Sequence, residues 1–96
     1  MHEAFNPGSR IPPHSMTVTV LLFAQARESA GRARLSLDLP EGSRVADALA
    51  LLEREHPALA SLRRHLAVAV DQRLVRPDEP LAHGAELALL PPVSGG

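Results

Sequence analysis

The chain has 96 residues, of which 45% are hydrophobic and 22% charged, and its formal net charge is −1 at pH 7. This length allows one domain with one modest core, and the composition is that of a globular protein rather than a disordered one. A charge so close to neutral argues against the clustered basic surface of a nucleic-acid-binding protein. The lack of cysteine excludes disulfides, thiolate metal sites and a cysteine nucleophile.

The first fifteen residues differ from the rest. They contain three prolines and a glycine and show little hydrophobic periodicity, which is typical of a flexible leader. We therefore expect a leader over residues 1–15 and one folded domain over residues 16–96. No apolar stretch approaches the roughly 20 residues of a membrane helix, and the N-terminus lacks the apolar core of a signal peptide. We expect a cytoplasmic protein that does not bind membranes.

The folded part opens with an alternating stretch, TVTVLLFA, over residues 17–24. Its polar and apolar side chains alternate as in a strand with one buried face, and at Leu21 and Phe23 the other face becomes apolar too. Because both faces of a central strand are covered, this pattern predicts a strand in the middle of a sheet. Residues 25–31 then predict a short helix that Gly31 ends.

A second strand and a long helix follow. The alternation of ARLSLDL over residues 33–39 predicts a hairpin partner of the first strand. Ser43 is expected to cap a helix, since its hydroxyl can accept a hydrogen bond from a first-turn amide, and Pro57 prevents that helix from continuing. The helix carries one apolar stripe at i, i+3, i+4 and i+7 that must face a sheet. The stripe consists of Val45, Ala48, Leu49 and Leu52.

The remaining segments are shorter. Residues 58–66 predict a further helical piece that carries its basic residues outward, and residues 67–70 and 86–90 predict two more strands. Residues 71–84, between these strands, are rich in turn residues. The order of strand, strand, helix, strand and strand predicts an α+β fold in which one main helix covers one mixed sheet.

Candidate catalytic side chains are sparse. Glu53 and His56 have the Glu-x-x-His spacing of a di-iron protein, but such a site needs two of these pairs and further carboxylates, so we expect no metal site. Asp47 and Glu55 lie with Glu53 on the helix away from its apolar stripe, which predicts a solvated charged face rather than acid–base chemistry. The glycines lack the following Gly-Lys-Ser/Thr of a phosphate-binding loop, so no ATP site of that kind is expected.

The C-terminal sequence LALLPPVSGG, over residues 87–96, points to a different chemistry. Glycine loses more conformational entropy on ordering than any other residue, so Gly95 and Gly96 are expected to be presented rather than packed, on a segment that prolines stiffen. A C-terminal carboxylate, with a reference pKa of roughly 3.3–3.7, is a poor electrophile at neutral pH. A partner that transfers AMP to it would supply a leaving group, which sulfide or a persulfide can replace to give a thiocarboxylate. The apolar residues Leu90, Pro91 and Val93 are expected to run off the sheet as a docking surface.

Three segments resemble the MoaD/ThiS family of ubiquitin-like sulfur carriers. They are LLFAQARESAG over residues 21–31, LAVAVDQRLV over residues 66–75, and residues 78–96 with the terminal glycines. The FAQARE segment favours the molybdopterin branch of the family. The resemblance implies an α+β fold of the β-grasp, or ubiquitin-like, type. It also implies a carrier, non-catalytic alone, that donates sulfur to cyclic pyranopterin monophosphate in molybdenum cofactor biosynthesis.

The same resemblance implies roles for single residues. Gly96 would carry the adenylate and then the thiocarboxylate, and Gly95 would give the tail clearance. The residues implied in partner contact are Arg27, Leu90, Pro91, Pro92, Val93 and Ser94. The implied partners are an adenylating enzyme of the ubiquitin-activating type, which uses ATP, and the large subunit of molybdopterin synthase. The chain itself is expected to bind no cofactor and no metal.

Three alternatives share this terminus. A carrier of the same kind can serve another pathway, such as thiazole or cysteine formation, because only its docking surface would differ. A ubiquitin-like modifier would be attached to target lysines through Gly96. In a plain interaction domain the glycine end would be incidental.

Overall fold

The first two strands form an antiparallel hairpin, as their alternation predicts. The computed structural model of the protein describes residues 14–91. Within them β1 (Ser15–Leu22) pairs with β2 (Arg34–Pro40) along both strands, with Val18 opposite Leu37. Ser15, the last residue of the predicted leader, belongs to β1, and residues 1–13 lie outside the described residues.

A short helix connects these strands. α1 (Ala24–Ala30) begins directly after Phe23, so the prediction that the first strand extends to residue 24 is wrong. The reason is that the carbonyl of Phe23 accepts the amide of Ala26 at 3.0 Å, which closes a helical turn instead of continuing the sheet. The helix ends at Gly31 as predicted, and the φ of 75° at this residue lies in the left-handed region that glycine adopts without strain.

The long helix α2 (Val45–Glu55) places its predicted apolar stripe in the core, where all four side chains are at most 4% exposed. The predicted helix cap by Ser43 is wrong. The Ser43 hydroxyl instead donates to the carbonyl of Pro40 at 2.7 Å. At this end of the helix it is the Asp47 carboxylate that accepts a hydrogen bond, from the amide of Arg44 at 2.8 Å.

Two single-turn 3₁₀ helices, η1 (Pro57–Leu59) and η2 (Arg63–His65), occupy the region of the predicted third helical piece. Arg63 does not point freely into solvent, because its Nη1 lies 3.1 Å from Oε2 of Glu53. The Glu53 side chain is only 22% exposed. The predicted solvated acidic face of α2 is therefore wrong at Glu53.

The second half of the chain adds three strands. β3 (Ala67–Val70) and β5 (Glu86–Leu90) have the predicted bounds and pair antiparallel. β4 (Arg73–Leu74), which the sequence pattern does not predict, pairs antiparallel with the end of β3. The two residues between them, Asp71 and Gln72, both have positive φ, as in the tight turns that suit the twist of a hairpin.

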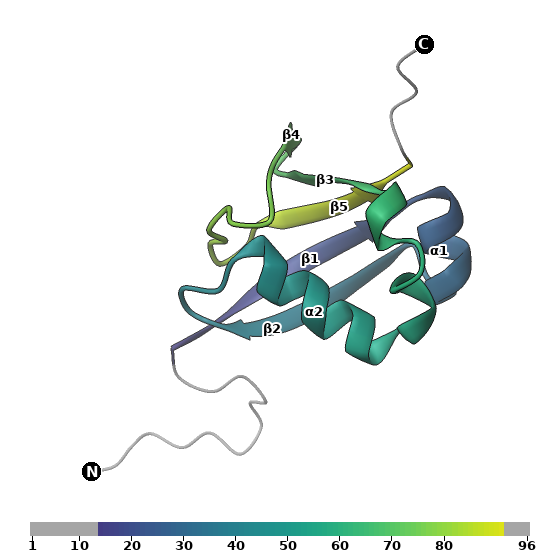
Figure 1. The fold of residues 1–96 in the computed structure, drawn as a ribbon. Coiled ribbons are helices and arrows are strands. Elements are labelled where there is room, and N and C mark those ends of the chain that lie inside the picture. Colours follow the sequence, from purple (N-terminus) through teal and green to yellow (C-terminus); the bar gives the residue numbers. More distant parts are fainter. Residues whose placement is uncertain (1–13, 92–96) are drawn as a thin grey trace.

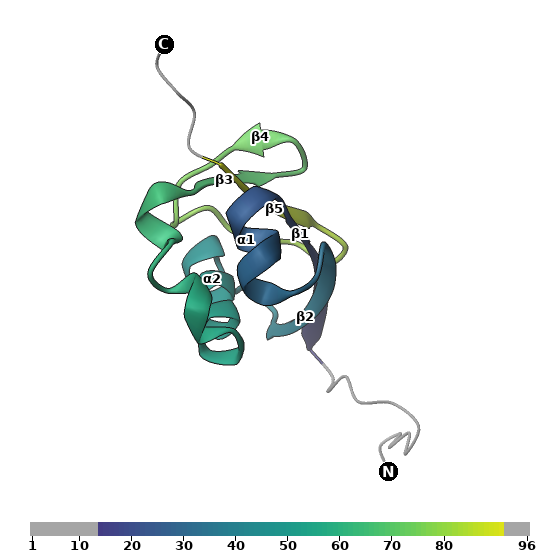
Figure 2. The ribbon, with the colours of Figure 1, turned by 90° about the vertical axis from the view of Figure 1, so that its right-hand side faces the viewer.

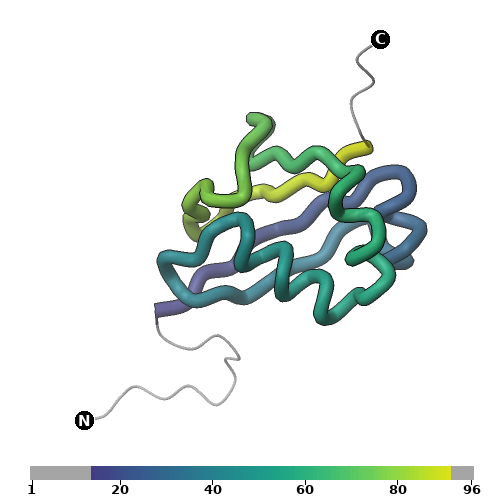
Figure 3. Tube along the Cα trace, in the orientation of Figure 1, coloured from purple at the N-terminus to yellow at the C-terminus, as the bar shows by residue number. Residues whose placement is uncertain are grey.

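These strands form one mixed sheet in the order β2-β1-β5-β3-β4, in which β1 and β5 are parallel. Figure 1 shows α2 across one face of this sheet, and Figure 2 shows α1 beside the ends of β1 and β5. The trace in Figure 3 brings β1 and β5 side by side, although they lie near opposite ends of the sequence. The arrangement is the β-grasp, α+β fold that the sequence predicts.

The core lies between α2 and the sheet, and its largest fully buried side chains come from β1, β2, α2, η1 and β5. They are Leu22, Leu37, Leu52, Leu59, Leu87, Val18, Val20 and Val45. Within residues 14–91, none of the helices has both the length and the apolar character that crossing a membrane requires.

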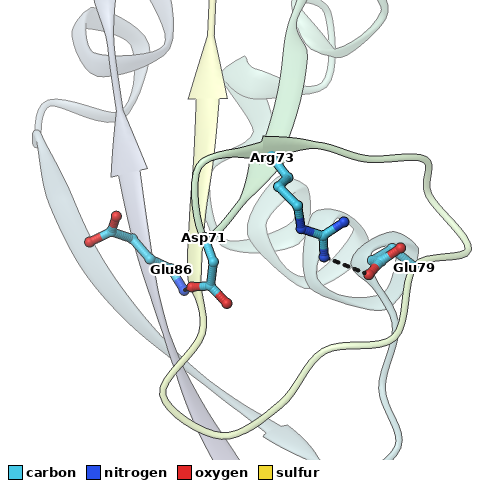
Figure 4. Close-up of polar contacts among 4 residues, drawn as sticks. All are labelled: Asp71, Arg73, Glu79 and Glu86. Carbon is cyan, nitrogen blue, oxygen red and sulfur yellow. Dashed lines mark hydrogen bonds and ion pairs between the residues drawn. The ribbon is translucent and has the colours of Figure 1, made fainter.

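Polar contacts hold the start of β5. The amide of Asp71 donates to the carbonyl of Glu86 at 2.9 Å, and the amide of Glu86 donates to Oδ1 of Asp71 at 3.0 Å. Figure 4 shows these residues beside Arg73, whose Nη2 lies 3.3 Å from Oε2 of Glu79. This exposed ion pair contributes little, about 0–1 kcal/mol. The two contacts between Asp71 and Glu86, one to a backbone carbonyl and one to a side-chain carboxylate, therefore join the end of β3 to the start of β5.

Candidate functional site

β5 carries the chain out of the fold from the middle of the sheet. On one side it pairs with β1, and the amide of Phe23 donates to the carbonyl of Leu89 at 3.3 Å. On the other side it pairs with β3, where Ala67 lies opposite Leu90. Leu90 is therefore held by its pairing with β3, whereas the pairing with β1 ends at Leu89. The exposed Pro91 that follows is the last described residue.

The predicted site residues fall partly within the described chain. Leu90 does not run off the sheet as predicted, because the ladder between β5 and β3 extends to it, and its side chain is half-buried. Pro91 and Arg27 are exposed. The other predicted site residues lie outside the described residues, and their roles stay predictions. They are Pro92, Val93, Ser94, Gly95 and Gly96.

The face of the sheet opposite α2 is apolar at the end where β5 leaves. Side chains that alternate with core residues point to this face, and residues paired in register lie side by side on it. Leu21 thus lies beside Ala88, and Ala67 beside Leu90, while Phe23, 41% exposed, directly follows β1. We call these residues the exit patch. It consists of Leu21, Phe23, Ala67, Ala88 and Leu90.

The other half of the same face is polar. Thr19 lies opposite Ser36 on one side and Glu86 on the other. The hydroxyl of Thr17 donates to Oδ1 of Asp38 at 3.1 Å. On this face of the described chain, apolar side chains therefore gather at the end from which the tail departs, and such a patch is typical of a docking site.

Two exposed arginines lie near this end of the sheet. Arg34 lies directly opposite Leu21 in the ladder between β1 and β2. Arg27 lies on α1, the helix that packs beside the end of β5 (Figure 2). Both side chains are exposed, and neither forms a salt bridge within residues 14–91. An apolar centre with a basic border favours a partner that is apolar at its centre and acidic at its rim.

Sequence reasoning assigned Leu90 and Arg27 to partner contact and placed the interface at the final strand, which includes Ala88, but it did not assign Leu21, Phe23, Ala67 or Arg34 to it. A signal was present at Leu21 and Phe23, where the first strand becomes apolar on both faces. The central position of β1 is confirmed. Its second face, however, is not covered by a helix of the described chain, since the helices lie on one side of the sheet (Figure 2), so the pattern indicates an apolar surface rather than a second core.

What the described residues offer at this site is contact rather than reactive groups. The exit patch supplies apolar area, and the two arginines supply guanidinium groups at its border. Within residues 14–91, side chains of His, Asp and Glu do not gather in a group of three or more that is able to hold a metal ion.

Comparisons with known proteins find relatives of similar sequence and similar fold. Among curated proteins, the molybdopterin synthase sulfur carrier subunit of Chlamydomonas reinhardtii is 41% identical over 83 residues, covering 84% of this chain and 100% of that protein. Small archaeal modifier protein 1 of Haloferax volcanii is 40% identical over 83 residues, covering 78% and 95%. The crystal structure of SAMP1 from Haloferax volcanii has a TM-score of 0.74 and 37% identity, covering 83% and 99%.

A family-wide comparison gives the same result. The match to the sequence model of the ThiS family spans residues 20–96, from within β1 to the terminal Gly96. It includes α2, β5 and every residue assigned to the tail. Because this match covers most of the sequence, the chain belongs to the ThiS family.

Proposed function

We propose that the chain is the sulfur-carrier small subunit of a molybdopterin synthase. The observation that carries the proposal is the 41% identity to the sulfur carrier subunit of Chlamydomonas reinhardtii, over the whole of that protein. Two features of this chain support it. The family match reaches Gly96, and β5 leads to Pro91 at the border of an apolar surface.

The reaction is proposed to take place at the carbonyl carbon of Gly96. An adenylating partner joins a carboxylate oxygen of this residue to the α-phosphorus of ATP, and pyrophosphate leaves. Sulfide then attacks the carbonyl carbon, and AMP leaves with the electron pair of the broken bond, which gives a thiocarboxylate. In the large subunit this sulfur attacks a carbon of cyclic pyranopterin monophosphate, and an oxygen bonded to that carbon leaves with the electron pair of the broken carbon–oxygen bond. Water then cleaves the resulting acyl–sulfur bond, which restores the carboxylate and leaves the sulfur on the pterin. Two such transfers supply the two sulfurs of a dithiolene.

The tail is proposed to enter the partner's pocket, and the exit patch is proposed to dock on the partner's surface. Gly95 gives clearance in a narrow channel because it has no side chain, and Pro91 and Pro92 lower the entropy lost when the tail is threaded. Val93 and Ser94 would line the entrance of the partner's pocket. The exit patch would dock on the large subunit, with Arg27 and Arg34 facing acidic groups at the rim.

Attachment to other proteins is a second candidate function. The observation that favours it is the 40% identity to small archaeal modifier protein 1 of Haloferax volcanii. Both functions begin with an activated Gly96. They differ in the nucleophile that attacks the activated carbonyl carbon. This nucleophile is sulfide in a carrier and an amine of a target protein in a modifier.

Mass spectrometry separates these functions. The protein is incubated with its adenylating enzyme, ATP and sulfide, and its intact mass is measured. We expect a gain of about 16 Da, because sulfur replaces one oxygen of the carboxylate. Removal of Gly96 should abolish this gain, and the circular dichroism spectrum should not change, because the described core is complete at Leu89.

A chain with one alanine added after Gly96 is the matched control, since it blocks the terminus without removing a residue. An unchanged mass for the original chain would contradict the carrier function. Covalent adducts with other proteins, in the absence of a thiocarboxylate, would favour the modifier.

A further inference from the structure

The outer edge of β2 has unpaired backbone groups. β2 is the first strand of the sheet order and has β1 as its only neighbouring strand in the described chain. At its two ends, the amide of Leu22 donates to the carbonyl of Ala33, and the amide of Glu41 donates to the carbonyl of His14. Odd-numbered residues of this segment therefore direct their backbone groups toward β1. The amides and carbonyls of the even-numbered residues point outward, and these residues are Arg34, Ser36 and Asp38.

A groove of about 650 Å³ runs between β2 and α2. Residues spaced i, i+3, i+4 and i+7 form its wall on the helix, so they share one face of α2. They are Asp47, Ala50, Leu51 and Arg54. On the side of the sheet, the exposed Pro40 adds apolar surface near the half-buried Leu51, and Leu39 lies beneath them with only 4% of its surface exposed. The groove therefore meets the free edge of β2 at Asp38, the outward-facing residue that also lines it.

The groove is acidic. Asp38, Glu41 and Asp47 line it, with Arg54 as the one cationic side chain among its lining residues. Asp38 accepts a hydrogen bond from a threonine hydroxyl, and Asp47 accepts one from a backbone amide. Glu41 is 66% exposed and lies 4.0 Å from a histidine nitrogen. None of the three carboxylates forms an ion pair with an arginine within residues 14–91, so the groove favours a cationic occupant.

We propose that this groove binds an extended segment of another protein, in which arginine or lysine alternates with apolar residues, and that the segment adds a strand to the edge of β2. A free strand edge is a template for such pairing, because main-chain hydrogen bonds provide affinity and alternate side chains provide specificity. Side chains of one face of the added strand lie against the half-buried Leu51 of α2. Those of the opposite face lie beside Asp38.

The groove and the exit patch lie at opposite ends of the strands. β2 is antiparallel to β1, so residues 38–43 lie at the end where β1 begins. β5 is parallel to β1, so it leaves the sheet at the other end (Figure 1). A protein bound in the groove therefore leaves the exit patch uncovered, and a segment paired along the whole of β2 reaches only Arg34 at the border of the patch. The chain can be held by one protein while its tail reacts in another.

Ser36 gives a selective test, because its amide faces outward and its side chain is exposed. Ser36→Pro removes one donor from the free edge and none from the ladder with β1, and proline is tolerated at such an edge. Ser36→Ala keeps the amide and is the matched control. The probe is a fluorescein-labelled peptide as long as β2, in which arginine alternates with valine, titrated into the full chain and followed by fluorescence anisotropy. We expect Ser36→Pro to weaken binding about fivefold, the value of one net hydrogen bond, and Ser36→Ala to leave it within about twofold.

Charge reversal gives a second test, which can be carried out even if the Ser36→Pro variant does not fold. Glu41→Arg places a cation in the groove, whereas Glu28→Arg makes the same change of net charge on α1, outside it. We expect Glu41→Arg to weaken binding about fivefold and Glu28→Arg to have an effect smaller than about twofold. In an amide NMR spectrum, the probe should shift the signals of Ser36 and Leu51 more than that of Ala88.

Several outcomes would overturn the proposal. No binding to the full chain would do so, as would equal binding of a peptide with glutamate in place of arginine. Equal effects of Glu41→Arg and Glu28→Arg would show general charge attraction instead of a groove. If the probe binds only after residues 1–13 are removed, the occupant is a segment of this chain, and a partner is likewise ruled out.

Discussion

Replacing Leu90 with glutamate tests whether the exit patch is a docking surface. Leu90 is the last residue of β5, its half-buried side chain lies beside Ala67, and the tail follows it directly. In the free protein, a glutamate at this position can keep its carboxylate in water. We therefore expect the free energy of unfolding to fall by no more than about 1 kcal/mol. In a docked carrier the carboxylate would instead be enclosed by apolar side chains.

The size of the binding defect follows from burial. Full burial of a leucine side chain contributes about 1.5–3 kcal/mol. Because Leu90 is half-buried in the free chain, about half of this remains to be gained on docking, so Leu90→Ala should weaken binding by about 1 kcal/mol, or about fivefold. Enclosing an unpaired carboxylate adds at least about 2 kcal/mol. Leu90→Glu should therefore weaken binding by about 3 kcal/mol, which is more than about a hundredfold.

Calorimetric titration of each variant with the large synthase subunit of the same source measures these differences. Ser36→Glu is the matched control, because it adds the same charge to the polar half of the same face. Its affinity should stay within about twofold of that of the original chain. An affinity of Leu90→Glu equal to that of the original chain, at an unchanged unfolding temperature, would refute the docking assignment. An equal loss in Ser36→Glu would refute it as well, since the effect would then not be local.

Three further predictions concern the fold. Leu52 is 1% exposed in the core, so Leu52→Ala leaves a cavity there. Urea unfolding should show that the free energy of unfolding falls by about 2–5 kcal/mol. In Gly31→Ala the added Cβ meets no atom within 4 Å, but the alanine must adopt a φ of 75°, so calorimetry should show that the free energy of unfolding falls by about 1 kcal/mol. Asparagine tolerates this φ better than alanine does, so Gly31→Asn should lower the free energy of unfolding by less. Glu53→Gln removes the charge that faces Arg63 at a partly exposed site, and it should lower the free energy of unfolding by about 0.5–1 kcal/mol, a difference that shrinks in high salt.

The elements that could be predicted are those whose signals are local. The alternation in β1 and β2, the apolar stripe of α2 and the left-handed glycine at the end of α1 each act within a few residues, so the sequence pattern shows them directly. The residue that caps the start of α2 was harder to predict. Ser43 and Asp47 are both able to accept a first-turn amide, and the choice between them depends on where Pro40 leaves the sheet. The two-residue strand β4 is too short to carry a pattern.

By itself, the sequence determined the α+β class and the order of the main elements, because these follow from backbone sterics and side-chain periodicity. Acyl chemistry at the last two residues is a prediction of the same sequence. Only the tertiary structure decided which surfaces stand next to that terminus. Leu21 and Ala88 become neighbours through the parallel pairing of β1 with β5, and the free edge of β2 exists because no other described strand pairs with it. Such surfaces depend on register between distant segments. A shift of one residue in that register would turn each side chain to the opposite face of the sheet.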